Sequence, residues 1–225
     1  MLQRIFLTAL IAGAIAGLFT AGIQRLKIVP LIEKAEVYEA ADAHDEHIGA
    51  GAAQAWEPQA GLERAVYTAL ADVMAGIGFA FLLTGAIALA GLRGYAVDAR
   101  RGILWGAAGF AVFALAPALG LPPLPPGMEA AELVERQLWW IATAAAAALG
   151  LGLIVFSPKL VYRVIGAGIL LLPYAIGAPA LPEAAAKVPA GLAAEFVVAS
   201  LAAAGAFWLV LGALSGWLYH RIGPA

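Results

Sequence analysis

The chain has 225 residues with a formal net charge of −2, and it contains no cysteine. Hydrophobic residues make up 63% of the chain and charged residues 12%, whereas soluble domains average about 45–50% apolar and about 25% charged residues. So few charges cannot cover a water-exposed surface, which excludes a soluble globular or a disordered protein. The lack of cysteine excludes disulfides, thiolate metal sites and cysteine nucleophiles. The near-neutral charge argues against nucleic acid as a partner.

Apolar segments that can cross a bilayer recur along the chain. A spanning helix needs about 20 predominantly apolar residues. The candidate spans are residues 5–23, 67–92, 102–120, 138–156, 160–177 and 192–219. The fifth is short, contains Pro173 and follows the fourth after only three residues, so five spans is the alternative. The sequence predicts an all-α, polytopic helical membrane protein with a single transmembrane domain of six helices.

The charge distribution predicts how the helices are oriented. With the N-terminus inside, the inner segments carry seven of the 13 basic residues but only one carboxylate, Asp98, whereas twelve carboxylates lie outside. Basic residues alone divide almost evenly between the two sides, but four of the outer ones lie in the longest loop, where the positive-inside rule has least force. We therefore expect both termini on the inner side of the membrane.

Residues 25–64 form the only large segment outside the predicted spans, an acidic outer (periplasmic) loop. Pro30 suits the first position of a helix, and the following residues contain no helix breaker until Gly49. We therefore expect a short helix over about 31–48.

Two histidines in this loop are candidate metal ligands. His44 and His47 lie one helical turn apart, so both imidazoles can reach one ion, and Asp45 lies between them. Imidazole suits Co²⁺, Ni²⁺, Cu²⁺ and Zn²⁺. Glu36 shares their helical face but lies about 12 Å away along the axis, so water, the 129–135 loop or another subunit would complete the ligand shell. The alternative is a solvated acidic helix whose histidines only titrate.

Two carboxylates, Asp72 and Glu195, lie inside apolar spans. An ionised group in hydrocarbon costs at least about 2.5–3.5 kcal/mol, so each should face a partner or a polar cavity. Counted from the start of their apolar stretches, both lie roughly 5–8 Å deep from the outer side. We expect a shared oxygen-lined vestibule with Gln24 and Thr68 as a site for an ion.

The alternative for these carboxylates is structural: Arg25 or Arg64 pairs with Asp72, and Glu195 is protonated or lies at the interface. The chain also lacks the GxxxxGK[ST], HExxH and GxSxG motifs, and its three serines are not accompanied by a histidine in the same span. We therefore do not expect an enzyme.

Small residues recur at four-residue spacing within several spans. The pairs are Gly13/Gly17, Ala12/Ala16, Gly102/Gly106 and Gly212/Gly216. Such stripes let helix backbones approach closely, so they predict helix–helix contacts.

An ordered series of motifs runs along the chain. The motifs are Ala35-Glu36-Val37-Tyr38-Glu39, Trp56-Glu57-Pro58, Gly61-Leu62-Glu63-Arg64, Trp105-Gly106-Ala107-Ala108-Gly109-Phe110, Leu115-Ala116-Pro117-Ala118-Leu119-Gly120-Leu121-Pro122-Pro123, Pro126-Gly127 and Arg136-Gln137-Leu138-Trp139-Trp140. Together they resemble CbtA, a family of predicted cobalt transporter subunits. The likeness extends from the N-terminus through the fourth span. One departure is that Leu124 and Pro125 stand where the family has Glu-Leu.

The resemblance implies a multi-pass bacterial inner-membrane component for cobalt uptake, linked to cobalamin supply. It implies Co²⁺, or Ni²⁺, as the transported substrate and no permanently bound cofactor. It also implies a small single-span partner with a histidine-rich terminus, CbtB.

The hypothesis from the sequence is a divalent-metal transporter subunit. The outer loop captures the ion at His44, His47, Glu36 and Asp45, and passes it to Asp72 and Glu195 between the first, second and sixth spans. The alternative is a non-transporting membrane scaffold or metal-binding accessory subunit.

Overall fold

The computed structural model describes residues 1–43, 58–59, 61–180 and 188–222, and these form helices joined by short connections. The helices are α1 (Leu2–Ile23), η1 (Gln24–Ile28), α2 (Val29–Ala43), α3 (Leu62–Leu92), α4 (Ala99–Phe110), η2 (Ala111–Leu115), α5 (Ala116–Gly120), α6 (Leu133–Phe156), α7 (Leu160–Ile176) and α8 (Ala190–Arg221). Within these residues, five helical stretches are long and apolar enough to cross a membrane, and α7 is a shorter apolar helix. The predicted class of polytopic helical membrane protein is confirmed.

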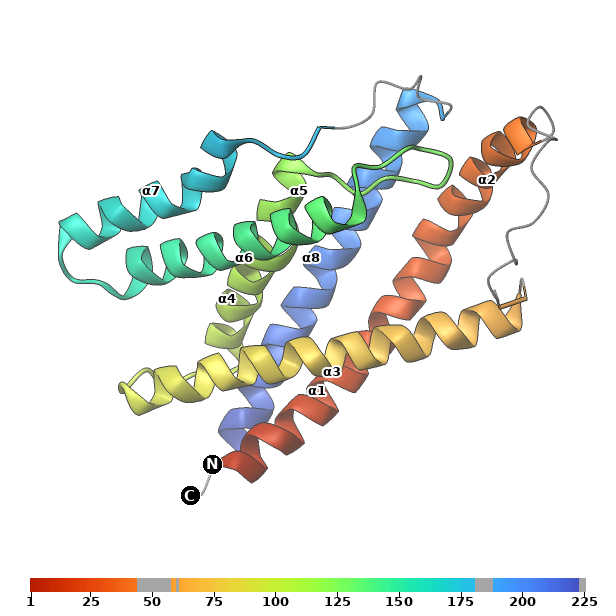
Figure 1. Cartoon of the computed structure of the whole chain (residues 1–225). Helices are drawn as coiled ribbons and strands as arrows, with labels where there is room; N and C mark the ends of the chain where they lie inside the picture. Colours follow the sequence, from red (N-terminus) through yellow and green to blue (C-terminus); the bar gives the residue numbers. More distant parts are fainter. Residues whose placement is uncertain (44–57, 60, 181–187, 223–225) are drawn as a thin grey trace.

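The two ends of the chain lie together at one end of the bundle (Figure 1). The Arg4 guanidinium lies 3.6 Å from the centroid of the Tyr219 ring, and its Nε donates to the Tyr219 carbonyl oxygen. Ends that touch lie on one side of a bilayer, so the chain crosses an even number of times. This favours counting α7 as the sixth crossing, although its 17 residues span only about 26 Å of a hydrocarbon core about 30 Å thick.

The first helix continues far beyond the span predicted for it. α1, η1 and α2 follow one another without a break from Leu2 to Ala43, a length of about 63 Å (Figure 1). That is twice the thickness of the hydrocarbon core, so α2 projects beyond the bilayer. The sequence analysis placed a loop after residue 23, but no glycine or proline between Ile23 and Val29 ends the helix. Residues 44–48 of the predicted loop helix lie outside the described residues.

Two turns of π-helix interrupt the α-helical ladder, and each precedes a proline by two residues. η1 ends at Ile28 before Pro30, and η2 ends at Leu115 before Pro117. Proline has no N–H, and its ring clashes with the carbonyl four residues earlier. Those carbonyls belong to Leu26 and Phe113, which lie inside the two π turns. The wider π turn therefore accommodates the proline without ending the helix.

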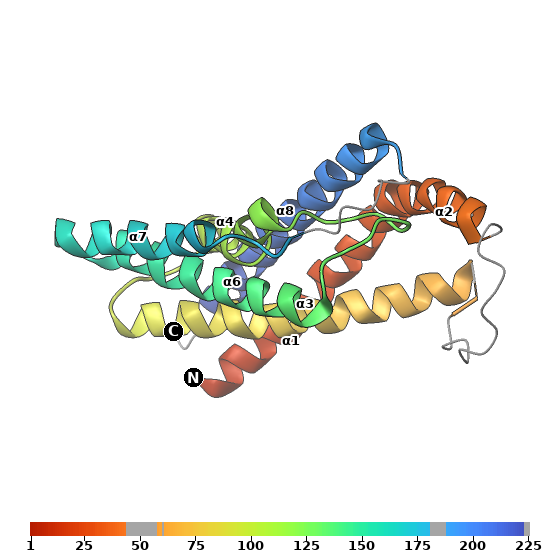
Figure 2. The ribbon, with the colours of Figure 1, turned by 45° about the horizontal axis from the view of Figure 1, so that its top comes forward.

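Aromatic side chains of the α6–α7 hairpin bind the carbonyls around the second π turn. The hydrogen bonds are Trp140 Nε1 to Phe113 O (3.2 Å), Trp139 Nε1 to Pro117 O (3.1 Å) and Tyr174 OH to Ala116 O (2.7 Å). The carbonyl that Pro117 cannot pair is therefore satisfied by Trp140. α6 packs against α7, η2 and α5. Figure 2 shows this hairpin on the opposite side of the molecule from α2.

Facing glycines set the closest helix contacts. A Cβ added to Gly212 of α8 would lie 2.3 Å from the carbonyl oxygen of Gly102 on α4, and one added to Gly13 of α1 would lie 2.5 Å from Ile77 Cα on α3. Both distances are shorter than any allowed contact, so the backbones touch because these residues lack side chains. The predicted packing role of the glycine stripes is confirmed. In the resulting core, α1, α3 and α8 pack against one another in pairs, and α4 packs on α8.

We predict that Gly212→Ala destabilises the protein, because the new methyl group meets the backbone of α4 and forces α4 and α8 apart. Overpacking of this kind costs about 1–3 kcal/mol. Gly85→Ala on α3 is the matched control, since an added Cβ there has no atom within 4 Å. Unfolding of the purified protein in mixed micelles measures both, and equal stability of the two variants would contradict the packing role.

A double-mutant cycle tests the partnership between Trp140 and Pro117. Trp140→Phe leaves the Phe113 carbonyl without its donor, which should cost about 0.5–1.5 kcal/mol. In a Pro117→Ala background the backbone N–H of residue 117 becomes available to that carbonyl, so the same Trp140→Phe change should cost less. Additive effects in the free energy of unfolding would show that the two residues act independently.

Candidate functional site

Asp72 lies where α3 crosses α1. A Cβ added to Gly17 of α1 would lie 2.5 Å from the Asp72 carbonyl oxygen, so the two backbones are in contact at this point. The Asp72 Oδ1 atom accepts a hydrogen bond from Gln24 Nε2 at 3.1 Å. Its Oδ2 atom is buried and has no hydrogen-bond partner among the described residues. The crossing therefore holds a carboxylate with one oxygen oriented by an amide and the other available to a proton or a cation.

Gln24 stands where α1 passes into the first π turn, and its own backbone N–H still bonds to the Thr20 carbonyl oxygen, as in an α-helix. Gln24 is the first residue of η1, which opens the helix ahead of Pro30. A π turn widens the backbone by one residue and shifts the direction of the side chains that follow, a feature common at functional sites. The partner of Asp72 is thus a neutral amide on the neighbouring helix, and the expectation that Gln24 lies near Asp72 agrees with the structure. The other predicted neighbour, Thr68, donates its hydroxyl to the Arg64 carbonyl at 2.9 Å.

Glu195 lies on another helix, α8, near its start, and is exposed. Arg4 and Tyr219 mark a common level on α1 and α8. Gln24, which holds the Asp72 carboxylate, lies about 30 Å along α1 from that level, and Glu195 lies about 36 Å along α8 from it. The shared vestibule of Asp72 and Glu195 stays a prediction.

Glu36 of α2 is engaged in an ion pair. Its Oε1 atom lies 2.9 Å from Arg64 Nη2, which joins α2 to the first turn of α3, and both side chains are substantially exposed. His44, Asp45 and His47 lie outside the described residues. Among the residues that are described, no three histidine, aspartate or glutamate side chains come together to hold a metal ion. The outer capture site remains a prediction.

Four buried hydroxyl groups lack a hydrogen-bond partner among the described residues, and none was assigned a role from the sequence. One, Thr143, lies on α6, and the other three lie in the core. Thr8 of α1, Thr84 of α3 and Ser215 of α8 are each 0% exposed, and their hydroxyl oxygens lack hydrogen-bond partners among the described residues. Their helices are the three that pack in pairs around the Asp72 crossing. Hydroxyl residues within otherwise apolar spans were the available signal, but such residues commonly bond to their own backbone, which hides a functional role.

A cavity of about 750 Å³ lies at the end of the same three helices where Arg4 meets Tyr219, and most of its lining residues are apolar. Gln3, Arg4, Tyr95, Tyr219 and His220 contribute its polar side chains. The Arg4 guanidinium is fixed against the Tyr219 ring, so the local charge at this end of the core is positive.

Comparison with known proteins gives one result. A family model described as "Probable cobalt transporter subunit (CbtA)" matches residues 2–220, which is nearly the whole chain. No curated protein and no solved structure matches it.

We predict that the Gln24–Asp72 pair is not required for folding. Gln24→Leu alone should destabilise the protein by about 1–3 kcal/mol, because it leaves a buried carboxylate without its donor. Replacing both partners, with Gln24→Leu and Asp72→Leu, should restore most of that stability, since neither polar group then remains. Unfolding in mixed micelles measures the difference, and a double variant less stable than Gln24→Leu would assign the pair a structural role.

Proposed function

The chain belongs to the CbtA family of probable cobalt transporter subunits, and on that premise we propose that it conducts Co²⁺ into the cell, with Ni²⁺ as the second candidate. Membership makes it a multi-pass membrane protein of a transporter and points away from an enzyme. The proposal assigns the route to the core of α1, α3 and α8, with Asp72 as the carboxylate that receives the ion. The observation that carries this assignment is the buried Oδ2 atom of Asp72, which has no hydrogen-bond partner in the described structure.

The chemistry of Asp72 fits passage of an ion rather than its retention. A carboxylate and an amide offer only oxygen ligands, which bind Co²⁺ more weakly than imidazole does. Conduction requires that the ion bind tightly enough to enter the site but weakly enough to leave it. Gln24 orients the carboxylate through one oxygen, so the other can turn to the ion without loss of that hydrogen bond.

Capture is proposed to occur in the outer segment. His44, His47 and the carboxylates around them, including Asp45, would bind the ion there, since imidazole is the suitable ligand for Co²⁺ and Ni²⁺. Glu36 would join them only by exchanging Arg64 for the metal. Glu195, exposed near the start of α8, would form a step between the outer segment and the deeper Asp72.

Beyond Asp72 the proposed route continues along the hydroxyl groups of Thr8, Thr84 and Ser215. Their buried oxygens are side-chain ligands that an ion could use within the otherwise apolar interior of these three helices. The surrounding residues are close-packed, with Ala9, Ala12 and Leu211 fully buried. An ion therefore passes only when the three helices separate, which makes conduction a gated process.

A specific observation favours the accessory alternative. Arg4 holds a positive charge at the inner end of the core and is fixed there by Tyr219. A cation arriving at this end meets repulsion unless Arg4 moves away. A subunit that binds metal or a partner without conducting ions would keep this contact closed. As a transporter subunit the chain acts with other subunits, and a small single-span, histidine-rich partner is our proposal for one of them.

The test is uptake of radioactive Co²⁺ into proteoliposomes that contain this chain, alone and with its partner. We predict that Asp72→Asn lowers uptake at every Co²⁺ concentration by about tenfold or more, whereas His44→Ala with His47→Ala raises the concentration needed for half-maximal uptake. Asp98→Asn is the matched control, because asparagine also caps a helix N-terminus and Asp98 lies away from the route.

Two results would contradict the proposed route. Unchanged uptake by folded Asp72→Asn would exclude Asp72 as the receiving carboxylate. Metal or partner binding without uptake in any preparation would support the accessory role.

A further inference from the structure

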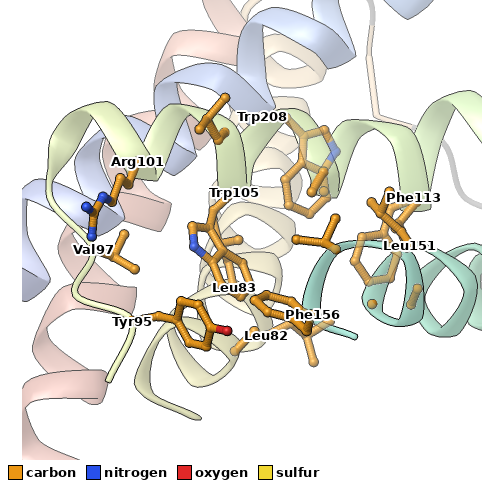
Figure 3. A pocket seen from close by; sticks show the side chains of 18 of the residues that line it. Leu82, Leu83, Tyr95, Val97, Arg101, Trp105, Phe113, Leu151, Phe156 and Trp208 are labelled. Carbon is orange, nitrogen blue, oxygen red and sulfur yellow. The ribbon is translucent and has the colours of Figure 1, made fainter. Parts of the chain in front are cut away.

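A second large cavity, of about 730 Å³, lies between the α6–α7 hairpin and the core. α3, α4 and α8 form one wall, and α6 forms the other (Figure 3). The wall is built of aliphatic and aromatic side chains, among them Leu83, Trp105, Val112, Leu151, Phe156 and Trp208. We call this cavity the hairpin groove. It exists because the hairpin is fastened at its other end, where Trp139, Trp140 and Tyr174 bind the carbonyls around Pro117.

The polar groups of the hairpin groove lie at one end, in the connection between α3 and α4 and the first turn of α4. Arg101, in that first turn, lines the groove next to Val97 (Figure 3). One Arg101 nitrogen donates to the Ala96 carbonyl oxygen at 2.5 Å, which fixes the guanidinium at this position. A guanidinium carries five N–H donors, so this bond leaves capacity for an anion. Trp105 and Tyr95 both contact the Phe156 ring, with centroid distances of 6.1 and 5.4 Å, and lie with Arg101 at the mouth of the groove.

The charge around this end is positive. Residues 93–101 contain Arg93, Arg100 and Arg101 against one carboxylate, Asp98. The backbone N–H of Arg101 donates to Asp98 at 2.9 Å and lowers the pKa of that carboxyl below its usual value, so Asp98 counts as a full negative charge. A net positive charge of two remains beside an apolar groove. This charge disfavours a cation, and an occupant must combine apolar chains with an anionic group.

We propose that the hairpin groove binds a phospholipid with an anionic headgroup, whose acyl chain fills the groove and whose phosphate lies at Arg101. The lipid comes from the leaflet at the end of the bundle where both termini lie. Basic pockets between transmembrane helices at that surface commonly bind anionic headgroups. The aromatic residues at the mouth are those that prefer the headgroup level. A volume of about 730 Å³ lies within the usual range of small-molecule pockets, so the groove takes an acyl chain and not the whole phospholipid. The bound lipid then occupies the space between the hairpin and the core.

Native mass spectrometry of the full-length chain measures this binding. The purified protein is stripped of lipid and given equal amounts of phosphatidylglycerol and phosphatidylcholine with identical acyl chains. We expect one retained phospholipid, with about fivefold preference for phosphatidylglycerol, and loss of that preference in Arg101→Gln. Arg101→Lys keeps the charge and should keep part of the preference, which separates a lost charge from a disturbed loop. Arg100→Gln is the comparison: it removes the same charge from this end but no group from the groove lining, so it should lose less of the preference than Arg101→Gln.

The acyl chain is tested independently by filling the groove. Gly152 lines it, and an added Cβ there has no atom within 4 Å, so Gly152→Leu should occupy the groove without moving a helix and should lower retention of both lipids. Gly168→Leu on α7, equally open but outside the groove, should have no effect. Three results would each overturn the proposal. The first is an equal loss of lipid preference in Arg100→Gln and Arg101→Gln, and the second is equal retention of the two lipids by the unaltered chain. The third is full retention of lipid by Gly152→Leu. If the protein captures a second protein chain, and Gly152→Leu abolishes that capture, the groove binds a protein helix instead of a lipid.

Discussion

A helix that continues through a proline loses a backbone donor, and the structure of this protein depends on how its helices accommodate that loss at two prolines. Pro30 and Pro117 each remove a donor, and each is preceded by a π turn that relieves the clash with an earlier carbonyl. The first π turn begins at Gln24, which binds Asp72. The second exposes carbonyls to the α6–α7 hairpin. One kind of backbone constraint therefore adjoins the candidate ion site and sets the attachment of the hairpin.

The two parts of the molecule are joined by different forces. In the core, glycine contacts bring α1 against α3 and α4 against α8 at distances that exclude any side chain. Such contacts are stabilised by dispersion over long stretches of backbone, since apolar burial alone gives no advantage over lipid. The hairpin is instead held by three hydrogen bonds at one end, each worth about 0.6 kcal/mol on average in a membrane, and by ring contacts of Phe156 with Trp105 and Tyr95 at the other. The hairpin groove lies between these two attachments, where the helices stay apart.

The electrostatics of the core bear on both proposed roles. A buried carboxylate with one unpartnered oxygen is expensive, and proteins keep such groups where a proton or ion uses them. The same core ends at Arg4, a fixed positive charge. A conducting subunit must move Arg4 and separate close-packed helices, whereas an accessory subunit need do neither. The free-energy cost that separates a conducting from an accessory subunit is therefore the cost of opening the Arg4–Tyr219 contact and the glycine interfaces.

The sequence by itself determined that the chain is a helical membrane protein, that its glycine stripes pack helices together, and that Asp72 is a carboxylate within an apolar span. Each of these depends on composition or on a short local pattern. The family resemblance was also readable there, through motifs that lie along most of the chain. The level of Glu195 relative to Asp72 was not determined, because apolar boundaries do not give the point at which helices begin and cross. The ion pair of Glu36 with Arg64 joins residues 28 positions apart, and no local pattern predicts it. The tertiary structure alone decided that Gln24 faces Asp72 and that Trp140 replaces the donor missing at Pro117. It also decided that Arg101 lies at the mouth of an apolar groove. Each of these contacts depends on the packing of separate helices.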